Sequence, residues 1–259
     1  MAAFTGERPG RGRGYEYDDS RHQAAYRAVV PFVVGRRVVD AGSGDGEGTS
    51  LLAGAASHVT GLDHHQPSVE LARERYGNGS TEFRVADLSV PWPVEAMDVV
   101  VAFQIIEHFD DDDAFVRNAL GALRPGGRAI ITTPNRLRSF SENPYHVREY
   151  TAGELAELLH RHGELVELMG VFGNERVEAF DERRQAQVEK WLRLDPLRLR
   201  DRLPRPVVER AFAILSGVVR RGAQRDTSER DAPITVDDFE VREGDLDTCL
   251  DLFAVVEKR

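Results

Sequence analysis

The sequence predicts an α/β fold with a parallel sheet, and two observations carry this prediction. Short apolar runs rich in Val and Ile alternate with helical segments, which is typical of strands buried on both faces and joined by right-handed crossovers. A glycine-rich turn, residues 42–48, follows the first run, at the kind of strand end where open α/β sheets bind ligands. The expected strands are RVVDA (37–41), HVTGLD (58–63), EFRVAD (82–87), MDVVVAF (97–103) and RAIITTP (128–134).

Helical and strand patterns continue on both sides of these runs. The segment TAGELAELLHRHG predicts an amphipathic helix with Thr151 as its N-cap and Glu154 placed for a capping box. The other expected elements are helices at 20–33, 48–56, 66–76 and 111–123 and strands at 165–172 and 250–258.

The stretch from about residue 173 to residue 245 differs from the rest of the chain. It is Arg-rich and helical, is broken by Pro196, Pro204 and Pro206, and separates two strands, so we interpret it as an insertion that acts as a lid or a homodimer element. A solvated helix is the usual meaning of the charge pattern at 207–221, and membrane or anion binding is the alternative. The predicted organisation is an N-terminal arm and helix (1–35), a cofactor-binding core (36–172), the helical insertion (173–245) and a last strand (246–259).

Composition narrows the classes of function. The 259-residue chain has a formal net charge of -10, which argues against nucleic acid held by a general positive field. The single Cys249 excludes an internal disulfide and a multi-Cys zinc site. The longest apolar run, residues 211–219, is too short to span a bilayer, and the N-terminus lacks the apolar stretch of a secretory signal. We therefore expect no membrane span and a cytoplasmic location.

The glycine turn does not follow the nucleotide-binding patterns. Gly42, Gly44 and Gly46 alternate, whereas the dinucleotide fingerprint needs two residues between its second and third glycines. That third position holds Glu47 in one register and Thr49 in the other. The phosphate loop of nucleoside triphosphatases is excluded as well, because no Gly-Lys-Ser/Thr follows.

The charge of the same turn points to a cationic ligand. A helix N-terminus favours an anion, but Asp40, Asp45 and Glu47 crowd this loop with negative charge. A cofactor that carries an ammonium and a sulfonium group suits such a loop better than a phosphate does.

The turn and the segments after it resemble a known family. VVDAGSGDGEG resembles motif I of class I S-adenosylmethionine-dependent methyltransferases, and VTGLDHHQPSVELAR, FRVADLSVPWP, MDVVVAFQIIEHF and ALRPGGRAIITTPNR resemble the elements that follow it in order. The resemblance covers about residues 37–136. It implies S-adenosylmethionine as cofactor and a Rossmann-like, doubly wound sheet of seven strands, with the helical insertion before the last.

The resemblance also implies cofactor-binding roles for residues of the first two strand ends. Gly42 and Gly44 let the backbone approach the methionine moiety, because a Cβ there would occupy the ligand's space. Asp40 orients the loop and the cofactor's ammonium. Asp63 accepts both ribose hydroxyls, with His64 beside the adenine. A helix cap is the alternative role of an Asp at a strand end.

Further cofactor contacts are expected from the next two strand ends and from the N-terminal helix. The resemblance implies that Asp87 accepts from the adenine amine, with the same helix-cap alternative, and that Leu88 adds a backbone contact. It places Phe103 and Gln104 near the methyl group. Arg21, in a segment that could fold over the site, is placed to pair with the cofactor's carboxylate.

Candidate catalytic residues lie in QIIEHF and NPYHVREYT. Glu107 and His108 resemble part of a Glu-x-x-Glu-His pattern that helps some methyltransferases bind a divalent cation such as magnesium. Gln104 replaces the first Glu and removes one carboxylate from such a site, so no metal ligand is assigned. The alternative is that Glu107 and His108 brace the loop.

TTPNR, NPYHVREYTAGEL and the N-terminal FTGER together resemble a bacterial methyltransferase group linked to glycan assembly, including mycobacterial methylated polysaccharides. This resemblance implies O-methylation of a saccharide hydroxyl, with His146 as a general base that accepts the hydroxyl proton. A purely structural hydrogen bond to the loop is the alternative for His146. The other open functions are N- or C-methylation of a small metabolite, and a non-catalytic cofactor-binding protein that binds a partner through its insertion.

Overall fold

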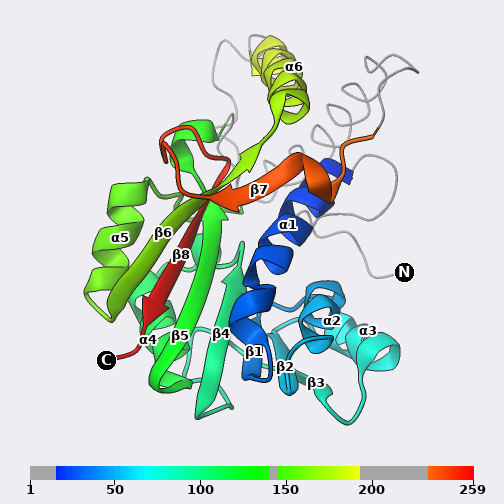
Figure 1. Cartoon of the computed structure of the whole chain (residues 1–259), viewed down its shortest axis with the longest axis vertical. Helices are drawn as coiled ribbons and strands as arrows, with labels where there is room; N and C mark the ends of the chain where they lie inside the picture. Colours follow the sequence, from blue (N-terminus) through cyan, green and yellow to red (C-terminus); the bar gives the residue numbers. More distant parts are fainter. Residues whose placement is uncertain (1–15, 140–144, 193–232) are drawn as a thin grey trace.

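One sheet of eight strands runs through the part of the chain that the computed structural model describes, residues 16–139, 145–192 and 233–259 (Figure 1). The strand order is β3-β2-β1-β4-β5-β8-β6-β7. The first five strands pair in parallel, whereas β8 is antiparallel to both of its neighbours and β7 is antiparallel to β6. The strands are β1 Arg37–Ala41, β2 His58–Asp63, β3 Thr81–Val85, β4 Met97–Phe103, β5 Leu123–Pro134, β6 Glu164–Gly173, β7 Phe239–Arg242 and β8 Asp251–Glu257.

The eighth strand corrects the count of seven that the family resemblance implies. β7 is four residues long and pairs with Gly170–Gly173 of β6 at the edge of the sheet. Only Phe239 of this strand is buried. The strand therefore lacks the group of buried apolar residues from which the other strands were predicted. β7 lies within the range 173–245 that was assigned to the insertion, which therefore returns to the sheet before β8 begins.

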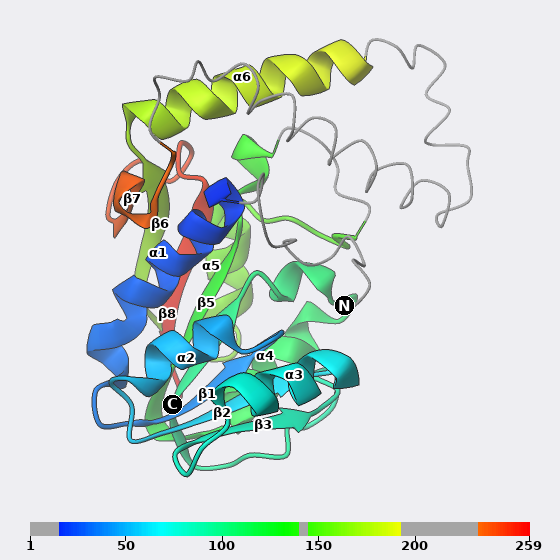
Figure 2. The same cartoon turned by 90° about the vertical axis from the view of Figure 1, so that its right-hand side faces the viewer.

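Helices cover both faces of the sheet (Figure 2). On one face, α1 and α2 pack against alternate apolar residues of β1 and β4, such as Val38 and Val99. On the other face, α4 and α5 pack against Val39 and Val100, the residues that alternate with them. The helices are α1 Glu16–Val33, α2 Glu47–Ala53, α3 Gln66–Tyr76, α4 Asp112–Gly121, α5 Ala152–His160 and α6 Glu175–Leu192, with 3₁₀ turns η1 Ile106–His108, η2 Arg136–Arg138 and η4 Val236–Asp238.

The parallel strands all end at one edge, below α6 in Figure 1, and we call it the carboxyl edge. α6 is joined to this region by a stacking contact between Phe180 and Tyr17 of α1, with ring centroids 5.0 Å apart. Because β8 runs antiparallel, its first residue also lies at the carboxyl edge.

Most predicted elements are confirmed, with shifts at their ends. β1, β2 and β4 begin and end as predicted, and the capping box of Thr151 and Glu154 is present. α1 begins at Glu16 and not at residue 20, and β5 begins at Leu123 and not at residue 128, with a shift in its register with β4.

Two predicted features fall on residues outside the described ranges. The arm before residue 16 and the Arg-rich segment 207–221 lie outside the described residues, so the lid and homodimer roles of the insertion stay predictions. Among the helices that are described, none is both long and apolar enough to cross a membrane.

Candidate active site

The candidate site lies where the strand order changes direction. β1 pairs with β2 on one side and with β4 on the other, and the helices that follow β1 and β4 pack on opposite faces of the sheet. Open α/β sheets bind ligands at such a switch point. Asp63 and Phe103 are the last residues of β2 and β4, and Asp40 is next to last in β1.

The glycine loop has the backbone conformation that its sequence requires. Gly42, Gly44 and Gly46 have φ angles of 81°, 56° and 86°, which only glycine adopts without strain. A Cβ on Gly42 would lie 3.0 Å from Ile105 Cδ1, whereas a Cβ on Gly44 would meet no atom within 4 Å. The loop is therefore packed at Gly42 and opens onto unfilled space at Gly44, where a ligand has room to approach the backbone.

Asp40 is fully buried and holds two helices to β1. Its carboxylate accepts hydrogen bonds from Thr49 Oγ1 of α2 at 2.6 Å and from Tyr26 OH of α1 at 3.0 Å. Burial raises the pKa of Asp40 to about 6. The predicted role in orienting the loop fits these contacts. Tyr26 was not singled out from the sequence, because a tyrosine on an apolar helix face reads only as a core residue.

Asp63 ties the glycine loop to the end of β2. Its Oδ2 accepts from the Gly44 N–H at 2.9 Å and its Oδ1 from the His65 N–H at 2.8 Å. α3 begins after His65, so Asp63 is not its N-cap. The adjacent His64 has a side chain that is 70% exposed, with Nδ1 3.7 Å from Asp63 Oδ1, and so presents an uncovered ring beside the carboxylate.

Asp87 and Leu88 follow β3 and have different surroundings. Asp87 is exposed, and its Oδ1 accepts from the Ser89 N–H and hydroxyl at 2.9 and 2.6 Å. These bonds lower the pKa of Asp87. The side chain of Leu88 is buried in the core, while its carbonyl accepts from Trp92 Nε1 at 3.1 Å. Asp87 therefore closes a local turn and not a helix, and its carboxylate stays at the surface of the site.

Phe103 and Gln104 end β4 next to the switch point. Phe103 is buried and meets the Tyr26 ring edge-on, with centroids 4.9 Å apart. Gln104 has a φ of 54°, an uncommon conformation for a residue other than glycine and one that clusters at functional sites. Its Nε2 lies 3.5 Å from Thr132 Oγ1 of β5, so its amide is directed toward the β5 side.

Arg21 reaches the carboxyl edge from α1, but its partner is a residue of the protein. Its Nε lies 3.2 Å from Oδ2 of Asp251, the first residue of β8. Asp251 was read from the sequence only as part of a strand, because nothing local distinguishes it. The prediction that Arg21 pairs with the cofactor's carboxylate is not tested by this contact.

Glu107 is buried in η1, beside the end of β5. Its Oε2 accepts from Thr133 Oγ1 at 3.0 Å, and its Oε1 has no hydrogen-bond partner among the described residues. Burial raises the pKa of Glu107 to about 7. Its backbone carbonyl also accepts from the Val147 N–H at 2.8 Å, which brings the loop after β5 onto η1.

This loop places the two predicted histidines together. The rings of His108 and His146 are 5.1 Å apart and nearly perpendicular. Nδ1 of His108 lies 2.9 Å from the Tyr145 carbonyl, and Nδ1 of His146 lies 2.7 Å from Glu149 Oε1. With Nδ1 donating to these oxygens, Nε2 is the basic nitrogen of each neutral ring. Glu149 was missed from the sequence, where it reads as a loop acid.

Glu107, His108 and His146 could also hold a divalent cation. Each offers one ligand atom, and these atoms lie within 4.8 Å of one another. The contacts to the Nδ1 atoms are of the kind that orient metal-bound histidines. Two imidazole nitrogens and one carboxylate suit a transition metal ion better than magnesium, which prefers oxygen ligands.

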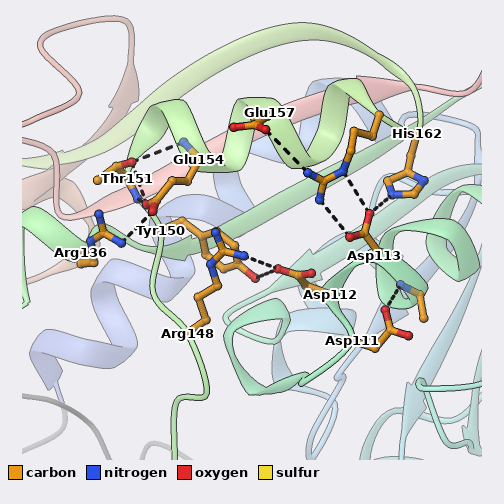
Figure 3. Close-up of polar contacts among 12 residues, drawn as sticks. Asp111, Asp112, Asp113, Arg136, Arg148, Tyr150, Thr151, Glu154, Glu157 and His162 are labelled. Atoms are coloured by element: carbon orange, nitrogen blue, oxygen red, sulfur yellow. Dashed lines mark hydrogen bonds and ion pairs between the residues drawn. The ribbon is translucent and has the colours of Figure 1, made fainter.

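An ion-pair network fixes the loop that carries His146 (Figure 3). Tyr150 is fully buried, and its hydroxyl donates to Asp112 Oδ2 of α4 at 2.9 Å, while Arg148 Nη1 lies 3.1 Å from the same oxygen. Asp113 pairs with Arg161 at 3.0 Å, and its Oδ1 lies 2.6 Å from His162 Nε2. The acidic first turn of α4, Asp112 and Asp113, therefore anchors the loop and the end of α5.

Comparison with known proteins shows the family of this chain. A family profile described as a methyltransferase domain matches residues 39–131. A probable S-adenosylmethionine-dependent methyltransferase of Mycolicibacterium smegmatis is 38% identical over 200 residues, covering 72% of this chain and 77% of that protein. A ubiquinone biosynthesis O-methyltransferase of a Methylobacterium species is 35% identical over 113 residues, 42% of this chain and 45% of that protein.

Similarity to a solved structure concerns the fold. An S-adenosylmethionine-dependent methyltransferase from Mesorhizobium loti has a TM-score of 0.57 at 16% identity, covering 93% of this chain and all of that one. The fold, the open glycine loop and the acid at the end of β2 define a class I methyltransferase site. By its similarity to the mycobacterial protein, the chain belongs to the S-adenosylmethionine-dependent methyltransferases. The cofactor predicted from the glycine loop is thereby supported.

Proposed function

We propose that this methyltransferase methylates a hydroxyl group of a saccharide or glycosylated metabolite, with His146 as the general base. The observation that carries the proposal is the 2.7 Å contact between His146 Nδ1 and Glu149. A carboxylate on one ring nitrogen orients the imidazole and stabilises its protonated form. A base of this kind is needed for a hydroxyl acceptor, whose proton must leave as the new bond forms.

The chemistry divides between the cofactor and the chain. When bound, S-adenosylmethionine would supply an electrophilic methyl group for the acceptor oxygen, and the electrons of the broken carbon–sulfur bond would stay on sulfur. His146 Nε2 takes the hydroxyl proton, and Glu149 holds the resulting imidazolium. Glu107 and His108 lie beside His146 at the carboxyl edge and hydrogen-bond the acceptor substrate.

A divalent cation is a second way for these residues to act. Glu107, His108 and His146 would hold it, and it would lower the pKa of a coordinated hydroxyl. Chelation of divalent cations distinguishes the metal-dependent mechanism from the mechanism with His146 as the base. Chelation removes activity if the cation is required and leaves it intact if His146 acts alone.

Two observations support oxygen and a saccharide as the acceptor. One relative is described as an O-methyltransferase. The motifs TTPNR and NPYHVREYT, the second of which carries His146 and Glu149, resemble those of a group linked to glycan assembly. N- or C-methylation of a small metabolite is the runner-up, and it needs less help from a base.

The first experiment measures binding, and the second measures turnover. Calorimetric titration is expected to show binding of S-adenosylhomocysteine and none of NADH. Transfer of labelled methyl groups to a panel of mannosides and glucosides then tests the acceptor, with and without a chelator. Failure of every hydroxyl acceptor, together with turnover of amines, would replace the proposal by its runner-up, and turnover of any acceptor dismisses a non-catalytic role.

His146→Gln tests the base directly, because glutamine still donates to Glu149 but takes up no proton. We expect kcat to fall by about 10²- to 10⁴-fold, the usual contribution of a general base, with unchanged affinity for S-adenosylhomocysteine. His160→Gln, at the exposed end of α5, is the matched control and should keep full activity. Full activity of the His146 variant contradicts the assignment.

A further inference from the structure

We propose that Asp251 is an acceptor-binding residue, whose Oδ1 takes a hydrogen bond from a hydroxyl of the acceptor other than the one that is methylated. The inference rests on the proposed function and deepens it, because it demands an acceptor with at least two hydroxyls.

The position of Asp251 follows from the topology. β8 enters the sheet between β5 and β6 and runs away from α6 (Figure 1). Asp251 is its first residue and pairs in register with Pro134, the last residue of β5, and with Val171 of β6. It therefore lies at the carboxyl edge, on the far side of β4 from Asp40 and Asp63. The acids predicted to bind the cofactor, Asp40, Asp63 and Asp87, lie on the β1–β3 side, and Phe103 and Gln104, predicted to lie near the methyl group, end β4. Asp251 lies beyond β4, toward the part of the edge left for the acceptor.

The bonding of Asp251 is incomplete. Its side chain is 4% exposed, and Oδ2 pairs with Arg21 Nε at 3.2 Å. Oδ1 is buried and has no hydrogen-bond partner at standard distance and angle among the residues that the structure describes. Burial raises the pKa of Asp251, and the Gln104 amide, which approaches the same carboxylate, opposes that rise. Buried carboxylate oxygens are nearly always bonded, and those that are not mark a place where function overrides stability. Arg21 fixes the carboxylate and leaves the second oxygen for a ligand.

Glu107 has a second buried carboxylate oxygen without a hydrogen bond in the described part of the chain, on the same side of β4 as Asp251. Glu107 Oε1 is also buried and unbonded within the described ranges. The charge of Asp251 contributes to the raised pKa of Glu107, so the two carboxyl groups lie within electrostatic reach of each other. An ionised carboxylate only accepts hydrogen bonds. When both carboxyl groups are ionised, a ligand that satisfies both oxygens must bring two donors. Burial raises the pKa of Glu107 to about 7, and its protonated form can also donate. A hydroxyl both donates and accepts, so a polyhydroxyl acceptor fits either form.

The test compares deoxy acceptors on two proteins. Asp251→Asn keeps a carbonyl oxygen for Arg21 and puts an amide NH₂ in place of the free oxygen. The probes are methyl mannoside, methyl glucoside and their monodeoxy analogues. With the wild type, one analogue should lose about tenfold or more in kcat/KM, the usual loss for one hydrogen bond to a charged group. With Asp251→Asn, the parent sugar should show that loss and the same analogue should show no further one.

A control variant and the affinity for S-adenosylhomocysteine separate acceptor binding by Asp251 from a structural role and from cofactor binding. Asp238→Asn is the control, because Asp238 of η4 is also a buried acid and has Arg176 and Asn174 as its partners. This variant should not alter the acceptor KM. An equal deoxy penalty in wild type and variant overturns the inference. So does a weaker affinity for S-adenosylhomocysteine with an unchanged acceptor KM, which would assign Oδ1 to the cofactor's ammonium.

Three further outcomes need separate treatment. If Asp251→Asn does not fold because Arg21 loses its partner, the pair Arg21→Gln with Asp251→Asn removes both charges, and the same analogue comparison applies. If the wild type turns over no saccharide, the proposed function fails and takes this inference with it. If the wild type turns over and the variants match it, this inference alone is wrong.

Discussion

At the ends of β1 and β2 the buried carboxylates accept hydrogen bonds from other groups of the protein. On the other side of β4, two buried carboxylate oxygens accept none among the described residues. Asp40 accepts from Tyr26 and Thr49, and Asp63 accepts from two backbone N–H groups. We call this the cofactor side. The acceptor side, with Glu107 and Asp251, keeps one oxygen of each carboxylate unbonded within the described residues.

The difference shows how each side is positioned. The cofactor side is built by neighbours in sequence, a glycine loop and the strand ends that flank it. The acceptor side is assembled from η1, from the loop before α5 and from the first residue of β8, which meet only in the folded chain. The acids of the cofactor side are held by the protein alone, whereas a bound acceptor would complete the hydrogen bonds of the acceptor side under our proposal.

The largest effect is expected when Asp63 is removed, because this acid of the cofactor side both holds the glycine loop and is predicted to bind the cofactor. Asp63→Ala deletes the carboxylate that anchors Gly44 and is predicted to bind the ribose. Because bonds to a charged group contribute about 1.5–3 kcal/mol each, we expect S-adenosylhomocysteine to bind at least about 100-fold more weakly. Calorimetric titration measures this. Asp87→Ala, which removes an exposed carboxylate, should cost less, and equal losses would contradict the ranking.

A pH titration of stability tests the acceptor side. Burial raises the pKa of Glu107 to about 7, from 4.5 in an ordinary glutamate. Between these values the folded protein holds a proton that the unfolded chain has released, so stability falls as pH rises. For Glu107 the loss from pH 5 to pH 7 should be about 2 kcal/mol.

Comparison of wild type and Glu107→Gln isolates this term, because the other buried acids are common to both. Denaturant unfolding at several pH values gives the free energy of unfolding, and the difference between the two proteins should change by that amount across the window. A difference that does not depend on pH would mean that Glu107 is ionised throughout.

The same contrast explains what the sequence could and could not predict. β1, β2 and β4 were placed to the residue because each is a short segment of buried apolar residues between two helical patterns. The glycine loop was recognised because its pattern is contained in a few consecutive residues. β7 was missed because only Phe239 of its four residues is buried. Residues such as Glu149 and Asp251 gave no signal, because their roles depend on partners brought together by the fold.

The smallest expected effect concerns the anchor of the loop. Tyr150→Phe removes the hydroxyl that donates to Asp112 at 2.9 Å, and the loss of one buried hydrogen bond should lower stability by about 1 kcal/mol. Because the same loop carries His146, kcat should also fall, by about tenfold, roughly the rate equivalent of that energy. Affinity for S-adenosylhomocysteine should not change, since no cofactor-side residue touches this anchor in the described contacts.

Asp113→Asn is the matched control for the loop anchor, because it weakens the neighbouring pairs with Arg161 and His162. These partners hold the end of α5 and not the loop, and Asp113 is 39% exposed, so the change in stability should be within about 1 kcal/mol. Its kcat should stay near that of the wild type. A variant of Tyr150 that loses cofactor affinity as much as rate would show that the two sides are coupled, and the comparison between them would then have to be abandoned.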